Sequence, residues 1–163
     1  MDVVERFATL KAQRTELNLY VLVDGLAYES HVGERLTPES GVNRALFAGT
    51  ADEPLAHAGP WLFQADQIED QLPALFKFEA TQPAVSWIIT PVSLEGLAQL
   101  LQLRQDLLLP SGKIALLRLS DPRVLGNLFT VMMPEQKHEF FGLIEEWHFL
   151  QHNQRVWTGR SHA

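Results

Sequence analysis

The segment over residues 113–128 constrains the fold most, because an apolar run changes there into the start of a helix. Its first half reads Lys-Ile-Ala-Leu-Leu-Arg-Leu, a pattern typical of a strand that is buried on both faces. Asp121 and Pro122 follow; an Asp carboxylate there can accept backbone N–H bonds, and Pro is favoured at the first helical position. We therefore expect a central strand, a turn and a helix, with Arg118 and Arg123 flanking the turn.

The hydrophobic pattern of the whole chain predicts strands that alternate with helices. We expect strands over residues 17–23, 61–64, 85–89, 144–150 and 155–158, with a turn at 152–154 between the last two. We expect helices over residues 3–12, 37–46, 68–78, 94–108, 122–129 and 134–142, and an irregular segment over 27–34.

This order of elements indicates a single α/β domain over residues 1–163, in which helices flank a mixed β-sheet. The core of the domain is expected to span about residues 17–150. A short N-terminal helix precedes it, and a C-terminal tail that is frayed over residues 159–163 follows it.

The composition restricts the classes of function. With 163 residues, 46% of them hydrophobic and 20% charged, the chain has enough apolar side chains for a folded core. A net charge of −7 argues against nonspecific binding to nucleic acids or anionic membranes, because both need a basic surface. The chain has no cysteine, which excludes disulfides and thiolate metal sites. The acidic N-terminus, and the lack of an apolar run near the ~18 residues of a spanning helix, predict a cytoplasmic protein without membrane insertion.

Three predicted strands end in polar turns, at Asp24, Thr90 and Asp121. If these strands are parallel neighbours, their ends share the sheet edge where α/β domains usually place sites. Asp24 and Asp121 would then form a carboxylate pair, the basis of an alternative function as a small-molecule or metal-dependent enzyme. A structural role explains the same residues, because turns and caps favour Asp and because Arg118 or Arg123 can pair with it. We favour the structural role.

His148 and His152 have the spacing of metal ligands on one face of a helix, with Glu145 three residues before His148. We expect a strand there instead, which would separate the two histidines by about 13 Å. The chain also lacks a Gly-x-Ser-x-Gly nucleophile motif and a Gly-rich phosphate loop. We therefore expect no catalytic residues, no metal site and no cofactor.

Several segments resemble one protein family in their order and spacing. They are residues 19–24, 46–50, 58–62, 93–97 and 109–113. The strongest match is residues 117–125, Leu-Arg-Leu-Ser-Asp-Pro-Arg-Val-Leu, which resembles the family's Arg-Phe-Tyr-Asp-Pro-Arg block but has Leu119 and Ser120 where the family usually has an aromatic pair. The family is that of the bacterial type VI secretion effector chaperones, also called adaptors, whose genes lie between those of the spike protein and a toxin. The resemblance covers about residues 17–150.

The resemblance implies a protein without enzymatic activity. Such adaptors bind a toxic effector in the producing cell and help to load it onto the secretion spike protein. The resemblance supplies no catalytic residues. Arg118, Asp121, Pro122 and Arg123 match only as a family motif, whose role is either structural or part of a binding site.

Recognition of an effector would bury apolar surface in a groove or add a strand to a sheet edge. The strand expected over residues 144–150 is our candidate edge, and Trp147, Phe149 and Trp157 are candidate anchors. Trp157 lies in a polar tail and is the best candidate for exposure.

Overall fold

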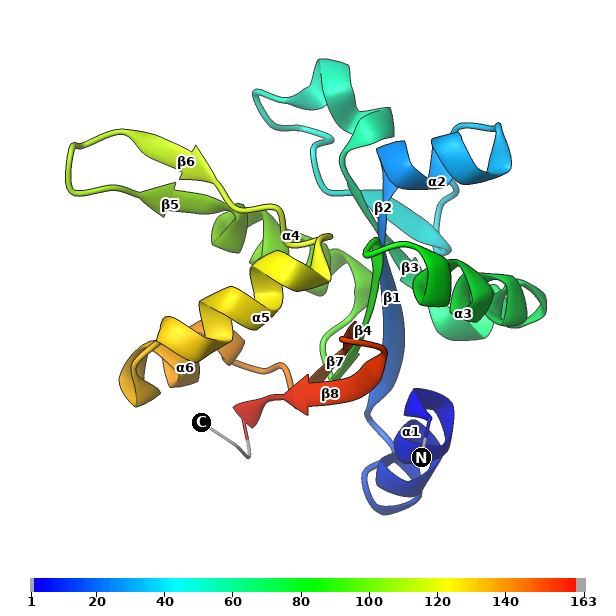
Figure 1. The fold of residues 1–163 in the computed structure, drawn as a ribbon. Helices are drawn as coiled ribbons and strands as arrows, with labels where there is room; N and C mark the ends of the chain where they lie inside the picture. The colour runs from blue at the N-terminus through cyan, green and yellow to red at the C-terminus, as the bar shows by residue number, and fades with distance from the viewer. Residues whose placement is uncertain (1, 161–163) are drawn as a thin grey trace.

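The computed structural model describes residues 2–160 and confirms an α/β domain in which helices flank a sheet (Figure 1). Residues 161–163 of the predicted tail lie outside the described residues. The six-stranded sheet has the strand order β2-β3-β1-β4-β7-β8, and its neighbouring strands all pair antiparallel. These strands are β1 Asn18–Asp24, β2 Asn43–Ala45, β3 Pro60–Gln64, β4 Val85–Thr90, β7 Glu146–Gln151 and β8 Gln154–Thr158.

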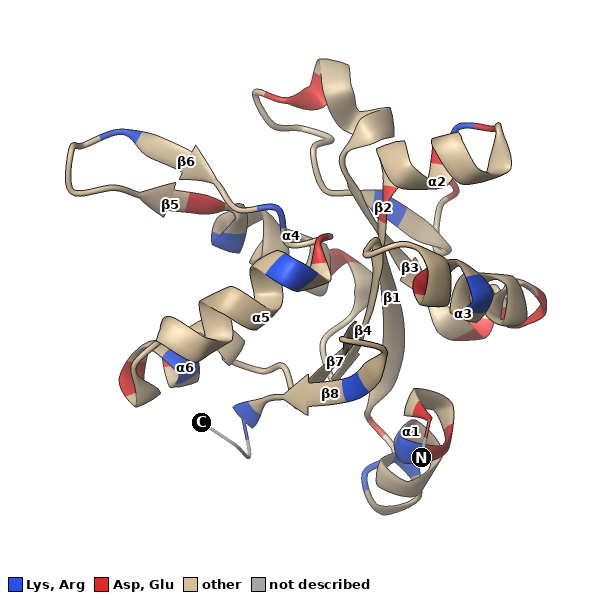
Figure 2. Ribbon diagram, viewed as in Figure 1, with Lys and Arg blue, Asp and Glu red and all other residues tan. Residues whose placement is uncertain are grey.

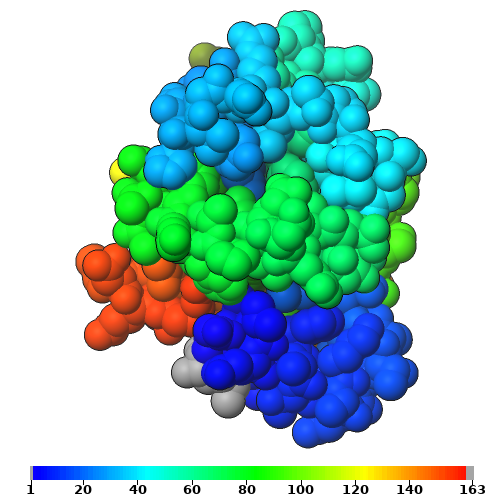
Figure 3. Space-filling model, turned by 90° about the vertical axis from the view of Figure 1, so that its right-hand side faces the viewer, coloured from blue at the N-terminus to red at the C-terminus, as the bar shows by residue number. Residues whose placement is uncertain are grey.

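Helices lie on both sides of this sheet. On one side are α4 Leu94–Gln105, α5 Pro122–Val131 and α6 Pro134–Phe141. On the other side are α1 Val3–Gln13, α2 Gly25–Val32 and α3 Leu72–Thr81, and on the face shown in Figure 3 α3 lies between α2 and α1. Three short 3₁₀ helices lie between β2 and α3 in the sequence. They are η1 Glu53–Ala58, η2 Ala65–Gln67 and η3 Glu69–Gln71.

Strand β1 divides the hydrophobic core into two halves, because successive side chains of a strand point to opposite faces. Tyr20 and Leu22 pack with residues of α4, α5 and α6. Leu19, Val21 and Val23 pack with residues of α1 and α3. The continuous apolar sequence of β1 is therefore what a strand covered on both faces requires.

Side-chain caps mark the start of several helices. Asp2, Asp24, Ser93 and Asp121 each accept a backbone N–H bond in the first turn of α1, α2, α4 and α5, respectively. The helix start predicted at Asp121 and Pro122 is thus confirmed.

Two predictions between residues 25 and 46 are wrong. The segment expected to be irregular lies mostly in α2, because Asp24 caps a helix. Gly25 fits there because a Cβ atom would clash with the carbonyl oxygens of His57 and Gly59. The helix expected over residues 37–46 is an irregular segment that leads into β2, which pairs with β3. Sheet pairing outweighs the helical spacing of the apolar residues there.

The expected central strand is the largest error. Within residues 2–160, β6 Ile114–Leu116 pairs only with β5 Asp106–Leu108, in a separate two-stranded sheet. This β5–β6 hairpin projects from the body of the molecule (Figure 1), and β5 takes residues that were expected to end α4. An apolar run does not by itself distinguish a buried strand from an exposed one. Only Leu119 of this run is fully buried.

The predicted terminal hairpin is confirmed. Strands β7 and β8 pair antiparallel, and His152 and Asn153 in the turn have φ values of 51° and 59°. Positive φ at both central residues is the requirement of a type I′ hairpin turn. Because β7 lies between β4 and β8, the prediction that this strand forms the sheet edge is wrong, and β8 forms that edge.

Replacing leucines on two faces of α4 tests this architecture. Leu101 is fully buried in the core, whereas Leu103 on the same helix is 75% exposed. We expect Leu101→Ala to lower the free energy of unfolding by about 2–5 kcal/mol, because the change leaves a cavity. We expect Leu103→Ala to change it by less than about 0.5 kcal/mol. Urea unfolding measures both values, and equal losses would contradict the assigned faces.

Candidate functional site

The carboxylate of Asp24 joins the main sheet to the turn between β6 and α5. Asp24 ends β1, and its Oδ1 accepts the backbone N–H of Ala27 at 2.9 Å as the cap of α2. Its Oδ2 accepts hydrogen bonds from Ser120 Oγ at 3.0 Å and from Arg118 Nη2 at 3.3 Å. Asp24 and Ser120 are both buried, so these bonds satisfy groups that have lost hydration.

Asp121 and Arg123 form a second ion pair beside the first. Oδ1 of Asp121 accepts bonds from the backbone N and the Nε of Arg123, at 2.9 and 3.0 Å, and Oδ2 accepts Nη2 at 2.8 Å. Burial raises the pKa of Asp121, but the side-chain and backbone hydrogen bonds from Arg123 outweigh this effect, and the pKa lies below its usual value. The charged carboxylate therefore fixes the start of α5.

A surface cleft of about 410 Å³ brings both ion pairs together. Its lining comes from α2, from the loop before β4 and from the β6–α5 turn. The lining residues include Asp24, His31, Arg118, Asp121 and Arg123. Figure 2 shows basic residues on the β6–α5 connection and at the start of α5. Of the predicted residues, Asp24, Arg118, Asp121 and Arg123 thus share one site.

The reason for this proximity differs from the one expected. The three polar strand ends do not meet at one edge of a parallel sheet, because β1 and β4 are antiparallel and Thr90 lies opposite Asn18, at the far end of β1 from Asp24. Strand β6 is not in the main sheet at all. Asp121 reaches the cleft because Ser120, next to it, is bonded to Asp24.

The two guanidinium groups at this cleft are available to a binding partner. The side chains of Arg118 and Arg123 are 62% and 73% exposed. Within residues 2–160, the side-chain bonds of Arg118 use only Nη2, and those of Arg123 use Nε and Nη2, so each keeps N–H donors for an external carboxylate. Both aspartates already accept bonds on both oxygens. The cleft is therefore better suited to binding acidic groups than to acid/base chemistry.

The aromatic residues proposed as anchors are not exposed. Trp147 is fully buried and Phe149 is buried in the same half of the core, so both would have to leave the core to reach a partner. Trp157 on β8 is half-buried, in contrast to the expected exposure. Its ring stacks on His148 and lies beneath the guanidinium of Arg6.

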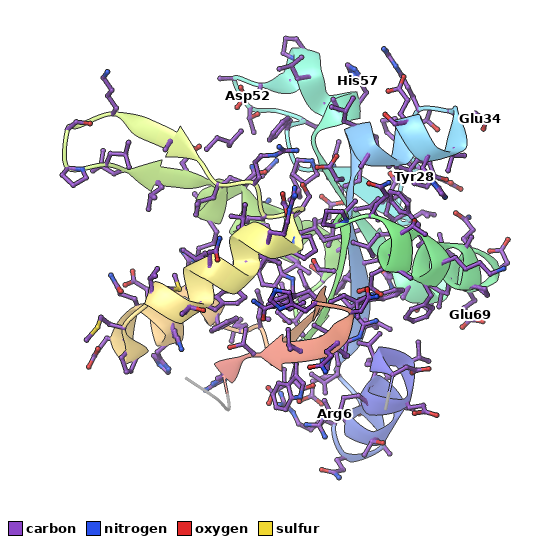
Figure 4. The ribbon with its side chains drawn as sticks, in the orientation of Figure 1. Arg6, Tyr28, Glu34, Asp52, His57 and Glu69 are labelled. Carbon is purple, nitrogen blue, oxygen red and sulfur yellow. The ribbon has the colours of Figure 1, made fainter. Side chains whose placement is uncertain are left out.

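A buried polar cluster between α1 and β7 was not predicted. Glu146 and His148 are buried; Glu146 accepts a bond from Arg6 Nε at 3.1 Å and lies 2.7 Å from His148 Nε2. Burial raises the pKa of Glu146, but bonds from His148 and Arg6 outweigh this and hold the pKa below its usual value. Arg6 extends from α1 toward the terminal strands (Figure 4), so the cluster ties α1 to the sheet. Glu146 and His148 are two residues apart and therefore lie on the same face of the strand. This spacing is a signal of the cluster in the sequence.

Residues 2–160 contain neither a cluster of metal ligands nor a membrane-spanning helix. Within residues 2–160, no group of three or more His, Cys, Asp or Glu side chains is placed to hold a metal ion. His148 lies in β7 beside Glu146, and His152 lies in the turn after it. No helix in this part of the chain is both long and apolar enough to cross a membrane.

Replacing Asp121 tests the structural role of its carboxylate. We expect Asp121→Ala to lower the free energy of unfolding by about 0.5–2 kcal/mol, because α5 loses its cap. Urea unfolding at pH 7 measures this loss. Asp52→Ala is the control, since Asp52 precedes η1 without a side-chain cap bond, and equal losses at the two positions would contradict the capping role.

The lowered pKa of Asp121 predicts a pH-dependent effect of Asp121→Asn. The stability that the charged carboxylate contributes is fully present above the unfolded pKa of about 3.9, and it is lost as the pH falls through the lower folded pKa. We therefore expect the variant to be less stable than the wild type at pH 7 and equally stable in acid, as measured by unfolding from pH 7 to pH 2. A difference that does not change with pH would contradict the ion pair.

Comparison with known proteins identifies a family. The model of a family described as Domain of unknown function (DUF4123) matches residues 19–139, which include most of β1, the β5–β6 hairpin and both ion pairs of the cleft. A search of curated proteins and a search of solved structures each gave no match. Because the family model matches well over half of the 163 residues, the chain belongs to the DUF4123 family.

Proposed function

We propose that the protein is a non-enzymatic adaptor of type VI secretion. In this proposal it binds a toxin effector in the cytoplasm of the producing cell and helps to load that effector onto the secretion spike protein. Two findings support the proposal: the resemblance of the ordered segments to the effector chaperones, and a family match that contains the strongest of them, residues 117–125.

The observation that carries the proposal is the position of the two arginines in the matched block. Asp121 of this block is buried and caps α5, whereas Arg118 and Arg123 are mostly exposed at a cleft. A purely architectural motif has no need of exposed guanidinium groups with spare N–H donors. Guanidinium groups recognise carboxylates with geometric specificity, which suits contact with a protein partner.

One observation favours the alternative function, a small-molecule or metal-dependent enzyme. Asp24 and Asp121 line the same cleft. We favour the adaptor because both carboxylates are engaged as helix caps and as partners of Arg118, Ser120 and Arg123. The alternative requires that Asp121→Asn abolish an activity without lowering stability, whereas the adaptor requires only the loss of stability described above.

Co-expression with the toxin encoded by the neighbouring gene tests the proposal. We expect the two proteins to co-purify and elute together, and the spike protein to bind the complex more weakly than the toxin does. If co-expression changes neither the solubility nor the elution of either protein, the adaptor function is wrong.

Charge-removing substitutions test the contribution of the cleft. We expect Arg118→Gln with Arg123→Gln to raise the Kd of the complex at least tenfold, because two charge-assisted contacts are lost. Arg35→Gln with Arg44→Gln is the matched control, since both of these arginines are exposed and ion-paired elsewhere. Calorimetric titration measures the Kd values. An equal effect of the two double variants would contradict a role of this cleft in binding.

A further inference from the structure

The β5–β6 hairpin exposes a set of large aliphatic side chains that lie outside the cleft of Arg118 and Arg123. Leu108 and Ile114 are 72% and 69% exposed. The exposed members of this apolar set are Leu107, Leu108, Leu109, Ile114 and Leu116. Contiguous apolar surface of this kind marks interaction sites in folded proteins.

The pairing register places three of these side chains on one face of the hairpin, whereas Leu107 lies on the other face with Ala115. Leu108 pairs with Ile114, and Asp106 pairs with Leu116. Because residues two apart on a strand share a face, Leu108, Ile114 and Leu116 lie together. Figure 2 shows that the projecting hairpin carries little charge along its length. Its exposed face is therefore apolar and uncharged apart from Asp106.

The length of this connection is not explained by packing. Helices α4 and α5 contribute to the same half of the core, and helix connections usually take about 2–8 residues. Here residues 106–121 join the two helices and extend outward before Leu119 returns to the core. Such an extension at the surface is typical of a functional segment.

The hairpin also has unused hydrogen-bonding capacity. Among the described strands, β5 and β6 pair only with each other, so each strand has an open outer edge. A two-stranded hairpin is marginally stable in water, and three or more strands with an apolar face are needed for stability. A third strand at an outer edge would supply the missing backbone bonds and would extend the apolar face beside these side chains.

We propose that the β5–β6 hairpin binds an extended segment of the effector, which adds to an open edge as a third strand. This inference rests on the proposed adaptor function. Added at the outer edge of β6, the segment would place alternate apolar β-branched or aromatic side chains beside Ile114 and Leu116, since strand addition combines main-chain bonds with contacts of alternate side chains.

A second copy of this chain is a poorer occupant than such a segment. Stable dimers use about 20–30 residues from each side, and the hairpin offers only a few apolar side chains. A net charge of −7 on each copy also opposes association. A single extended strand matches the size of the apolar face.

The test replaces a cross-strand pair without removing the hairpin. Leu108→Lys with Ile114→Glu makes the exposed face polar and places opposite charges directly across the strands. We expect the full-length double variant to keep its melting temperature and to bind the neighbouring toxin with a Kd at least tenfold higher. Hydrogen exchange of residues 106–116 in the wild type should slow when the toxin binds.

Leu55→Lys with Val131→Glu is the matched control, because these two apolar side chains are exposed on other elements. We expect it to change the Kd less than twofold. An unchanged Kd for the hairpin variant, or unchanged exchange in a stable complex, would overturn the docking site and leave the adaptor function intact. A dimer of the protein alone that the hairpin variant converts to a monomer would identify a second copy as the occupant and overturn the proposal. A wild-type protein that does not bind the toxin would overturn the adaptor function, and with it the choice of an effector segment.

Discussion

Strand β1 is buried on both faces, and this constraint organises the rest of the domain. Its neighbours β3 and β4 pair with both of its edges, so its backbone is bonded on each side as well. Each face then needs its own cover, which α4, α5 and α6 provide on one side and α1 and α3 on the other. A strand in this position tolerates a polar side chain only where it leaves the core, and Asp24 occupies that end.

Asp24 converts the end of the strand into a point of attachment. Its carboxylate starts α2 through Ala27 and holds the β6–α5 turn through Ser120 and Arg118. The chain is therefore fixed again immediately after the β5–β6 hairpin, and Leu119 re-enters the core beside this contact. Because both ends of the hairpin are anchored to the body, the hairpin itself is free to project without weakening the packing of α4 and α5.

Local signals in the sequence predicted several of the elements that local chemistry determines. The strand ending at Asp24 and the helix start at Asp121 and Pro122 follow from residue types that act within a few positions. The burial of a strand depends instead on what covers its faces, so the apolar run of β6 was assigned to the core although it is exposed. Trp147, a candidate anchor for a partner, lies in the core, since aromatic composition alone does not specify a face.

In residues 117–125, which carry the strongest family resemblance, the buried and the exposed side chains have different physical roles. Leu119 and Ser120 stand where the resembled family has an aromatic pair, and both side chains face inward, one into the core and one onto Asp24. A difference at these positions therefore changes internal packing and leaves the outer surface as it was. Arg118 and Arg123, which match the block, face outward. In this block the two arginines are therefore the side chains most exposed to a partner, while Leu119 and Ser120 between them contact the core and Asp24.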